Sequence, residues 1–102
     1  IGPYAFKPAF KRLTPPQEEG ARPVRDIRLT EKETNILKYL YRAGGKPVAR
    51  EELLEEVWGY NSGVTTHTLE THVYRLRQKI EPEKGVATLL MTEPGGYRLA
   101  LD

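Results

Sequence analysis

The sequence of 102 residues contains no cysteine. This absence excludes disulfides, thiolate zinc sites and cysteine nucleophiles, and it suits a reducing, cytoplasmic location. No apolar run approaches the roughly 18 residues that a membrane-spanning helix needs. Neither sign of charge dominates, because the sequence contains 16 Lys and Arg residues and 14 Asp and Glu residues. Net charge alone therefore does not indicate a nucleic-acid binder, and the distribution of the charges has to decide.

The length fits one compact domain over residues 1–102, with a single modest core. The first residues show neither an initiator Met nor a signal-peptide pattern, so we expect a piece of a longer protein. In residues 1–29, five prolines separate short extended stretches such as YAF, FKRL and VRDIRL. These stretches predict short strands in an antiparallel sheet.

Residues 30–81 show helical periodicity instead. Thr30 followed by Glu33 is a capping box, and the helix that it opens should end at the glycines of positions 44 and 45. The apolar face of this helix is predicted to hold four residues: Ile36, Leu37, Leu40 and Tyr41. A second helix, in REELLEEVWG, starts without a capping side chain at Ala49. Its predicted apolar face also holds four residues: Leu53, Leu54, Val57 and Trp58.

The segment TTHTLETHVYRLRQKIE, residues 65–81, predicts a third helix, with Thr65 or Thr66 as its cap. A narrow apolar stripe should face the core: Leu69, Val73, Leu76 and Ile80. The opposite side is polar. Between positions 67 and 79, three Lys and Arg residues accompany one acid, so the basic character of the chain is concentrated here.

Residues 87–101 contain TLLMTEPGGYRLAL, which predicts a β-hairpin around EPGG with Tyr97 in its core. The order of strands, three helices and a hairpin describes a winged helix-turn-helix, an α+β fold. In such a fold, the third helix fits the major groove of double-stranded DNA.

The polar side of the third helix therefore predicts DNA contacts. Five residues are candidates for contacts with base edges: His67, Thr71, Tyr74, Arg75 and Gln78. Five others are candidates for contacts with phosphates: Thr68, His72, Arg77, Lys79 and Arg98. Arg77 has a competing structural interpretation, an ion pair with an acid from another helix. The general alternative is a charged face that simply meets water.

Four motifs stand in series: LTEKETNILKYL, REELLEEVWG, HTLETHVYRLRQKIE and GGYRL. In this order and at this spacing they resemble the C-terminal effector domain of OmpR/PhoB-type two-component response regulators, over about Arg28 to Leu101. The resemblance implies a bacterial transcription regulator with a four-stranded N-terminal sheet. It also implies a third helix in the major groove and a hairpin wing that reaches toward the minor groove.

The same resemblance implies partners. A phosphorylated receiver domain would precede this domain in the parent chain and would pair the domains head to tail on direct repeats, and the isolated domain would be a monomer. The loop between the second and third helices would contact RNA polymerase. This loop consists of Gly59, Tyr60, Asn61, Ser62, Gly63 and Val64.

The sequence departs from the family pattern at three places. His67 stands where the family often has Arg, and Tyr74 stands where it often has a second basic residue. The wing reads TEPGGY in place of TVRGxGY, so that Glu93 or Pro94 occupies the place of the tip arginine. These departures favour an alternative function, a winged-helix protein-interaction module without DNA readout.

A metal site or an active site would be a third possibility. His67 and His72 are five residues apart and do not share a helical face, whereas His67 and Glu70 have a suitable spacing. No Ser-His-Asp set, phosphate-binding glycine loop or cofactor motif is visible. We therefore expect no catalysis, no cofactor and no bound metal, and we interpret Trp58 as an anchor between helices. A metal-dependent enzyme would instead contain stoichiometric zinc.

Overall fold

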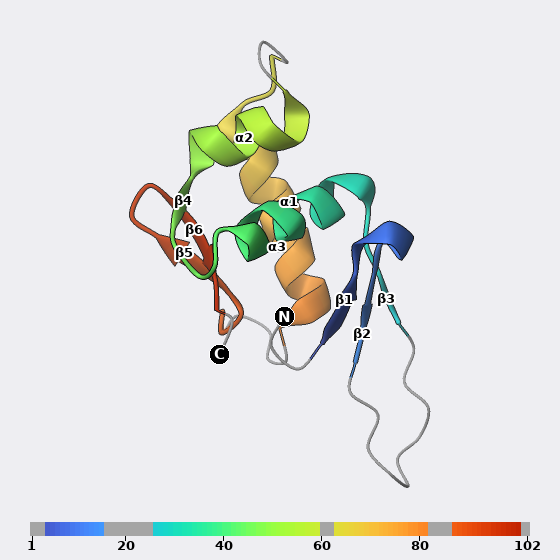
Figure 1. Ribbon diagram of the computed structural model, residues 1–102. Helices are drawn as coiled ribbons and strands as arrows, with labels where there is room; N and C mark the ends of the chain where they lie inside the picture. The colour runs from blue at the N-terminus through green and yellow to red at the C-terminus, as the bar shows by residue number, and fades with distance from the viewer. Residues whose placement is uncertain (1–3, 16–25, 60–62, 82–86, 101–102) are drawn as a thin grey trace, which may run out of the picture.

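The computed structural model describes residues 4–15, 26–59, 63–81 and 87–100. Three helices lie between two small sheets (Figure 1), which is the predicted α+β winged-helix arrangement. The helices are α1 (Glu31–Arg42), α2 (Arg50–Trp58) and α3 (Thr66–Ile80). Among the described residues, no helix has both the length and the apolar character that a membrane span requires.

The N-terminal sheet is antiparallel, as predicted. It consists of β1 (Ala5–Lys7), β2 (Arg12–Thr14) and β3 (Ile27–Arg28), in that order. A single 3-10 turn, Pro8–Phe10, joins β1 to β2. Leu13 of β2 is fully buried and anchors the sheet on the core. The resemblance implied four strands, and the described residues contain three in this sheet.

The predicted capping box starts α1. The Thr30 hydroxyl accepts a hydrogen bond from the Glu33 amide, and the Glu33 carboxylate accepts one from the Thr30 amide. Ile36, Leu37 and Leu40 are fully buried, as predicted. Tyr41 was wrongly placed on this face, because it lies about 100° around the helix from Leu40 and is 52% exposed.

The second and third helices pack as their periodicity predicts. In α2, Leu53 and Val57 are buried, while Leu54 and Trp58 are partly buried against the core. All four residues of the predicted α3 stripe are at most 1% exposed: Leu69, Val73, Leu76 and Ile80. Thr65 is the N-cap of α3, but its side chain makes no capping hydrogen bond.

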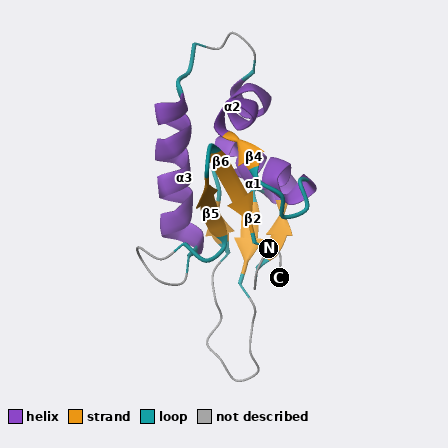
Figure 2. Cartoon of the chain, turned by 90° about the vertical axis from the view of Figure 1, so that its left-hand side faces the viewer, coloured by secondary structure: helices purple, strands orange, loops and turns teal. Residues whose placement is uncertain are grey.

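The predicted hairpin forms the wing, from β5 (Leu90–Glu93) and β6 (Gly96–Leu99). Tyr97 is 3% exposed and belongs to the core, as predicted. A two-residue strand, β4 (Val48–Ala49), which the sequence did not predict, pairs with the other edge of β6. In Figure 2, the rest of the fold lies to one side of α3, so the opposite side of this helix faces outward.

Candidate nucleic-acid interface

The outward side of α3 holds the five predicted base-contact residues. His67, Tyr74, Arg75 and Gln78 are exposed and Thr71 is half-buried. Positions 67, 71, 74 and 78 follow the four- and three-residue steps that line up along one helical face. The five therefore form one continuous polar strip, which we call the reading strip: His67, Thr71, Tyr74, Arg75 and Gln78.

Besides His67, three side chains of the reading strip are free within the described residues. Tyr74 is 64% exposed. Tyr74, Arg75 and Gln78 make no hydrogen bond or ion pair with another described residue. The Thr71 hydroxyl instead donates to the backbone oxygen of His67 at 3.0 Å, one turn earlier in the helix. A guanidinium, an amide and a phenol are thus available on this surface for an external ligand.

Two of the residues predicted to contact phosphates, Lys79 and His72 of α3, make contacts within the protein. The Lys79 ammonium lies 2.6 Å from a Glu33 carboxylate oxygen and donates to the Arg28 backbone oxygen at 3.1 Å. The His72 Nδ1 atom lies 2.9 Å from the Thr68 backbone oxygen. The His72 ring also packs edge-on against Trp58, with 5.0 Å between the centroids. Trp58 therefore joins α2 to α3.

Arg77 is bound to the wing. Its Nε atom donates to the Leu90 oxygen at 2.9 Å, and its Nη2 atom donates to the Thr92 hydroxyl at 2.7 Å. The structural role considered for Arg77 thus involves the wing, whereas the sequence suggested an acid on a helix. Its Nη1 atom makes no hydrogen bond with the described residues.

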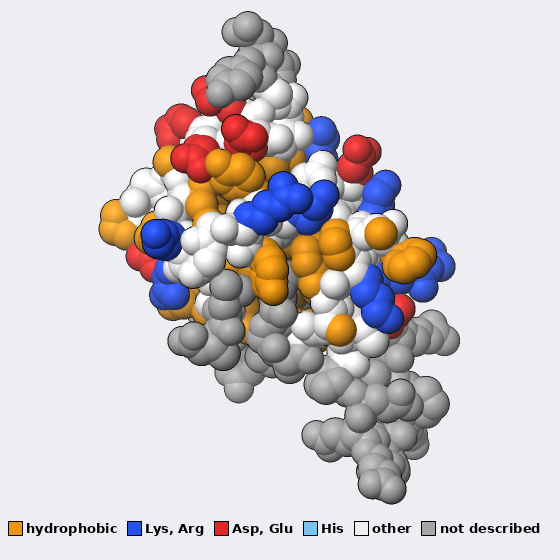
Figure 3. Space-filling view, in the orientation of Figure 1, with side chains coloured by type: hydrophobic (Ala, Val, Ile, Leu, Met, Phe, Trp, Pro, Cys, Tyr) orange, Lys and Arg blue, Asp and Glu red, His pale blue; other side chains and the backbone are white. Residues whose placement is uncertain are grey.

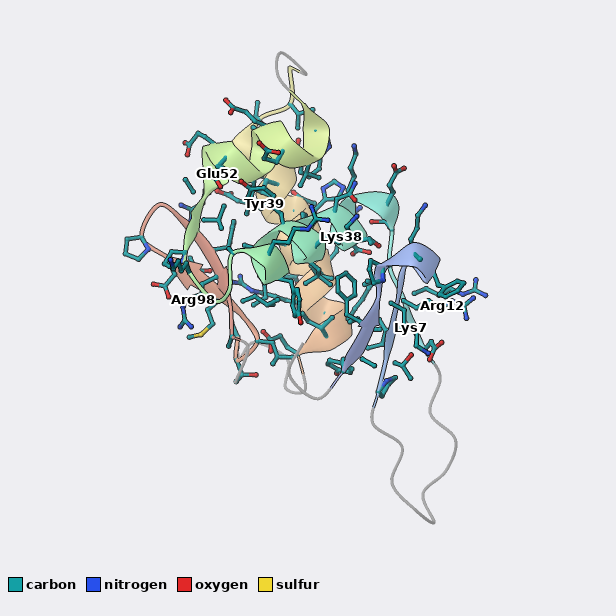
Figure 4. All side chains as sticks on the ribbon, in the orientation of Figure 1. Lys7, Arg12, Lys38, Tyr39, Glu52 and Arg98 are labelled. Atoms are coloured by element: carbon teal, nitrogen blue, oxygen red, sulfur yellow. The ribbon has the colours of Figure 1, made fainter. Side chains whose placement is uncertain are left out.

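The wing carries the last predicted phosphate contact, Arg98 (Figure 4). Its Nε atom lies 2.7 Å from a Glu93 carboxylate oxygen on the neighbouring strand, and its Nη2 atom lies 3.0 Å from the Met91 sulfur. Both side chains of the ion pair are about a third exposed or less. The wing arginine is therefore neutralised by the same acid that departs from the family pattern.

Arg50, at the start of α2, was not predicted from the sequence as a site residue. Its guanidinium lies 5.2 Å from the centre of the Tyr97 ring, and Arg77 lies 5.7 Å from the same ring. Arg50 Nε is 3.7 Å from Glu70 but has no hydrogen-bond partner among the described residues. A cation at a helix N-terminus interacts unfavourably with the helix dipole. This unfavourable position is the sequence signal that could have indicated a functional role for Arg50.

The remaining predicted contacts lie elsewhere or outside the description. Thr68 is half-buried in the first turn of α3, and its backbone amide donates to the Thr65 oxygen. Of the predicted polymerase-contact loop, Gly59, Gly63 and Val64 are described, and the two glycines have positive φ angles. Tyr60, Asn61 and Ser62 lie outside the described residues.

Exposed acidic side chains gather on α2. Figure 3 shows the face on which α1 lies in front of α3, with Asp and Glu gathered over α2 and Lys and Arg over α1. Four exposed acids belong to α2: Glu51, Glu52, Glu55 and Glu56. Glu52 accepts a hydrogen bond from the Tyr39 hydroxyl of α1 (Figure 4). In the described part of the chain, no group of three or more His, Asp or Glu side chains is placed to hold a metal ion.

An outward polar helix beside a β-hairpin wing defines the class of winged-helix DNA-binding domains. Residues 24–99 match the family model described as "Transcriptional regulatory protein, C terminal". The chain belongs to this family, in its OmpR/PhoB-type branch, and its general function is DNA binding in the regulation of transcription.

Curated relatives agree with this assignment. The chain is 42% identical over 74 residues to the sensory transduction protein RegX3 of Mycobacterium leprae, covering 72% of this chain and 37% of RegX3. It is also 40% identical over 74 residues to the probable transcriptional regulator ycf27 of Galdieria sulphuraria, covering 70% of this chain and 29% of that protein. The chain thus spans about a third of the length of the curated relatives that it matches.

Solved structures share the fold. The DNA-binding domain of Bacillus subtilis CssR superposes with a TM-score of 0.72 at 30% identity, covering 95% of this chain and 99% of that domain. The response regulator DrrB of Thermotoga maritima, an OmpR/PhoB homologue, superposes with a TM-score of 0.66 at 33% identity. That match covers 74% of this chain and 34% of DrrB.

Proposed function

We propose that this domain recognises a specific double-stranded DNA sequence by placing α3 in the major groove, and that it acts by occupying its site. The observation that carries this proposal is the reading strip. Tyr74, Arg75 and Gln78 point away from the fold with no partner among the described residues. Donors and acceptors on an outward helix are what base-edge readout requires.

Each member of the reading strip has a proposed role. Arg75 can donate two hydrogen bonds to guanine O6 and N7, and Gln78 can pair with adenine. Thr71 and Tyr74 would meet thymine methyl groups or nearby phosphates, and His67 would contact a base edge near the start of α3.

Phosphates would be met mainly where α2, α3 and the wing come together. Arg50 and the Nη1 atom of Arg77 flank Tyr97 there. Thr68 and His72 remain candidates on α3. Lys79 and Arg98 are weaker candidates, because each would have to leave a carboxylate that it contacts at 2.7 Å or less. Breaking such an ion pair would offset much of what a phosphate contact contributes.

The parent protein is proposed to be a response regulator. The support is the family and the similarity to RegX3, a sensory transduction protein. A phosphorylated receiver domain in the parent chain would pair two of these domains on direct repeats in the cytoplasm, and the isolated domain would be a monomer. The Gly59–Val64 loop would contact RNA polymerase.

Selection of the domain against a random duplex pool tests the proposed DNA binding, followed by anisotropy titrations of the enriched and a scrambled duplex. We expect a recurring motif and a higher affinity for the enriched sequence. The plot of log K against log salt should have a slope of about −0.9 per phosphate contact, hence near −2 if Arg50 and Arg77 make the main contacts. A slope near −4.5 would indicate that all five predicted phosphate contacts, or as many others, meet phosphates.

Replacing Arg75 by alanine tests base readout directly. We expect a loss of about 1–3 kcal/mol on the enriched sequence and relaxed selection at one base position. Arg42→Ala, at an exposed arginine of α1, is the matched control and should leave binding unchanged. An equal loss on the enriched and scrambled duplexes would refute the assignment of Arg75.

The alternative is a protein-interaction module. The ion pair between Glu93 and Arg98 favours it, because it leaves the wing without a free arginine. Such a module would show no salt-dependent affinity for either duplex.

A further inference from the structure

Within the described residues, no strand pairs with the outer edge of β5 in the wing. The strand order β4-β6-β5 places β5 at the outside of its sheet. An edge strand leaves alternate backbone N–H and C=O groups without partners from the sheet. The last turn of α3 and its C-cap residue Glu81 supply partners for these groups at Leu90. Arg77 Nε donates to the Leu90 oxygen at 2.9 Å, and the Glu81 carboxylate accepts from the Leu90 amide at 3.0 Å.

Glu81 binds the backbone of the residues that lead into β5. Its carboxylate accepts hydrogen bonds from the amides of Thr88, Leu89 and Leu90, all at 3.0 Å. It also accepts one from the Thr88 hydroxyl at 2.9 Å. Hydrogen bonds to a charged acceptor are shorter and stronger than neutral ones. One side chain at the end of α3 therefore binds three successive residues that lead into the wing.

Arg77 and Glu81 act together because they are four residues apart and lie on the same side of the helix end. Arg77 adds a second bond to β5, from Nη2 to the Thr92 hydroxyl at 2.7 Å. We call this set the wing clamp: Arg77, Glu81 and the backbone from Thr88 to Leu90, where β5 begins. It joins the helix that carries the reading strip to the hairpin beside it.

We infer that Glu81 is a positioning residue for DNA binding: through the wing clamp it fixes the wing relative to α3. This inference rests on the proposed function, in which α3 and the wing meet DNA at the same time. The distance between the wing and α3 then decides whether the wing reaches the DNA backbone when α3 lies in the major groove of DNA. Glu81 itself touches no DNA and acts through the position of β5.

The substitution Glu81→Gln tests the inference. Glutamine keeps the size of the side chain, but it has one acceptor oxygen and turns an NH2 group toward backbone donors. Exchange of the Leu89 and Leu90 amides with solvent should accelerate on the order of tenfold, while the buried amides of α1 keep their rates. Affinity for the enriched duplex should fall on the order of tenfold. Glu56→Gln, at an exposed glutamate of α2, is the matched control.

A hydroxyl-radical footprint separates positioning from stability alone. Well below the melting temperature, Glu81→Gln should lose protection of the backbone beside the wing and keep protection beside α3. A wild-type footprint with only a lower melting temperature would overturn the inference. If the wild-type domain shows no salt-dependent DNA binding at all, the proposed function fails and this inference fails with it.

Arg77→Lys gives a second test that does not depend on the folding of Glu81→Gln. Lysine keeps the charge but presents a single nitrogen, which cannot reproduce the fork that holds Leu90 and Thr92. We expect the same loss of protection beside the wing in this variant. Full protection beside the wing in this variant would contradict the wing clamp.

Discussion

Replacing Lys79 by methionine should destabilise the fold and leave the salt dependence of DNA binding unchanged. The sequence suggested a phosphate contact for this residue, but its ammonium lies 2.6 Å from Glu33 and 3.1 Å from the Arg28 oxygen. Glu33 is 2% exposed and belongs to the capping box of α1. Lys79 therefore neutralises a buried carboxylate that joins the C-terminal part of α3 to the start of α1.

The size of the effect follows from the exposure of the two partners. Removing one member of a fully buried ion pair costs about 3–5 kcal/mol, because the other charge is left without its partner. Here the Lys79 side chain is 35% exposed, so water already screens part of the interaction. Glu33 also keeps its bond from the Thr30 amide at 2.8 Å. We therefore expect a loss of about 2 kcal/mol, within the range for a hydrogen bond to a charged group.

Urea unfolding and DNA titration together test this prediction. In thermal unfolding, a loss of about 2 kcal/mol corresponds to a decrease in Tm of about 8–16 °C for a domain of this size. Lys38→Met is the matched control, because Lys38 is on α1 and has no hydrogen bond or ion pair with another described residue. Unchanged stability, together with a salt slope of DNA binding that is shallower by about 0.9, would refute this prediction. It would indicate that Lys79 contacts a DNA phosphate.

Two further predictions concern pH and the wing. Burial would raise the pKa of Glu33, but hydrogen bonds from Lys79 and Thr30 and the charge of Lys79 outweigh it and lower this pKa from 4.5. The charged carboxylate therefore stabilises the fold above about pH 4.5. The free energy of unfolding should fall as the pH drops through the lower folded-state pKa of Glu33. This decrease should be smaller in the variant Glu33→Gln. A Cβ atom at Gly96 would lie 1.9 Å from the Val48 oxygen, so Gly96→Ala should cost about 3 kcal/mol in urea unfolding. Gly95→Ala has open space around it and should cost only about 1–2 kcal/mol, for its positive φ; equal losses would contradict the steric explanation.

The helices could be predicted because their signals are local. A capping box lies within four residues, and an apolar stripe repeats within each turn, so Thr30 and Leu69 could be placed without knowledge of the rest of the fold. β4 could not be predicted in this way. It is only two residues long and exists because Val48 and Ala49 pair with Tyr97 and Gly96, far along the chain. Tyr41 was misplaced because it lies at the edge of the apolar arc, where neighbouring elements decide burial.

The direction of side chains on α3 was also predictable, but the use of its charges was not. Periodicity places Arg75, Arg77 and Lys79 outside the apolar stripe. It cannot show that Arg77 binds β5, or that Lys79 binds Glu33 of α1, because these partners come from distant segments. The pair of Arg98 with Glu93 is different. Arg98 lies opposite Met91 in the hairpin, so Glu93 is its diagonal neighbour, and the register of the hairpin could have suggested the pair.

The internal partners change what α3 offers to DNA. Of its three Lys and Arg side chains, only Arg75 has no partner within the described residues. The rest of the reading strip contains no Lys, Arg, Asp or Glu. Phosphate contacts supply most of the non-specific affinity, whereas base contacts supply discrimination, so this helix favours discrimination over affinity. A single domain would then bind weakly, and stable occupancy would require two linked or neighbouring copies whose binding is no longer independent. The contacts of α3 alone therefore favour the proposed pairing on direct repeats.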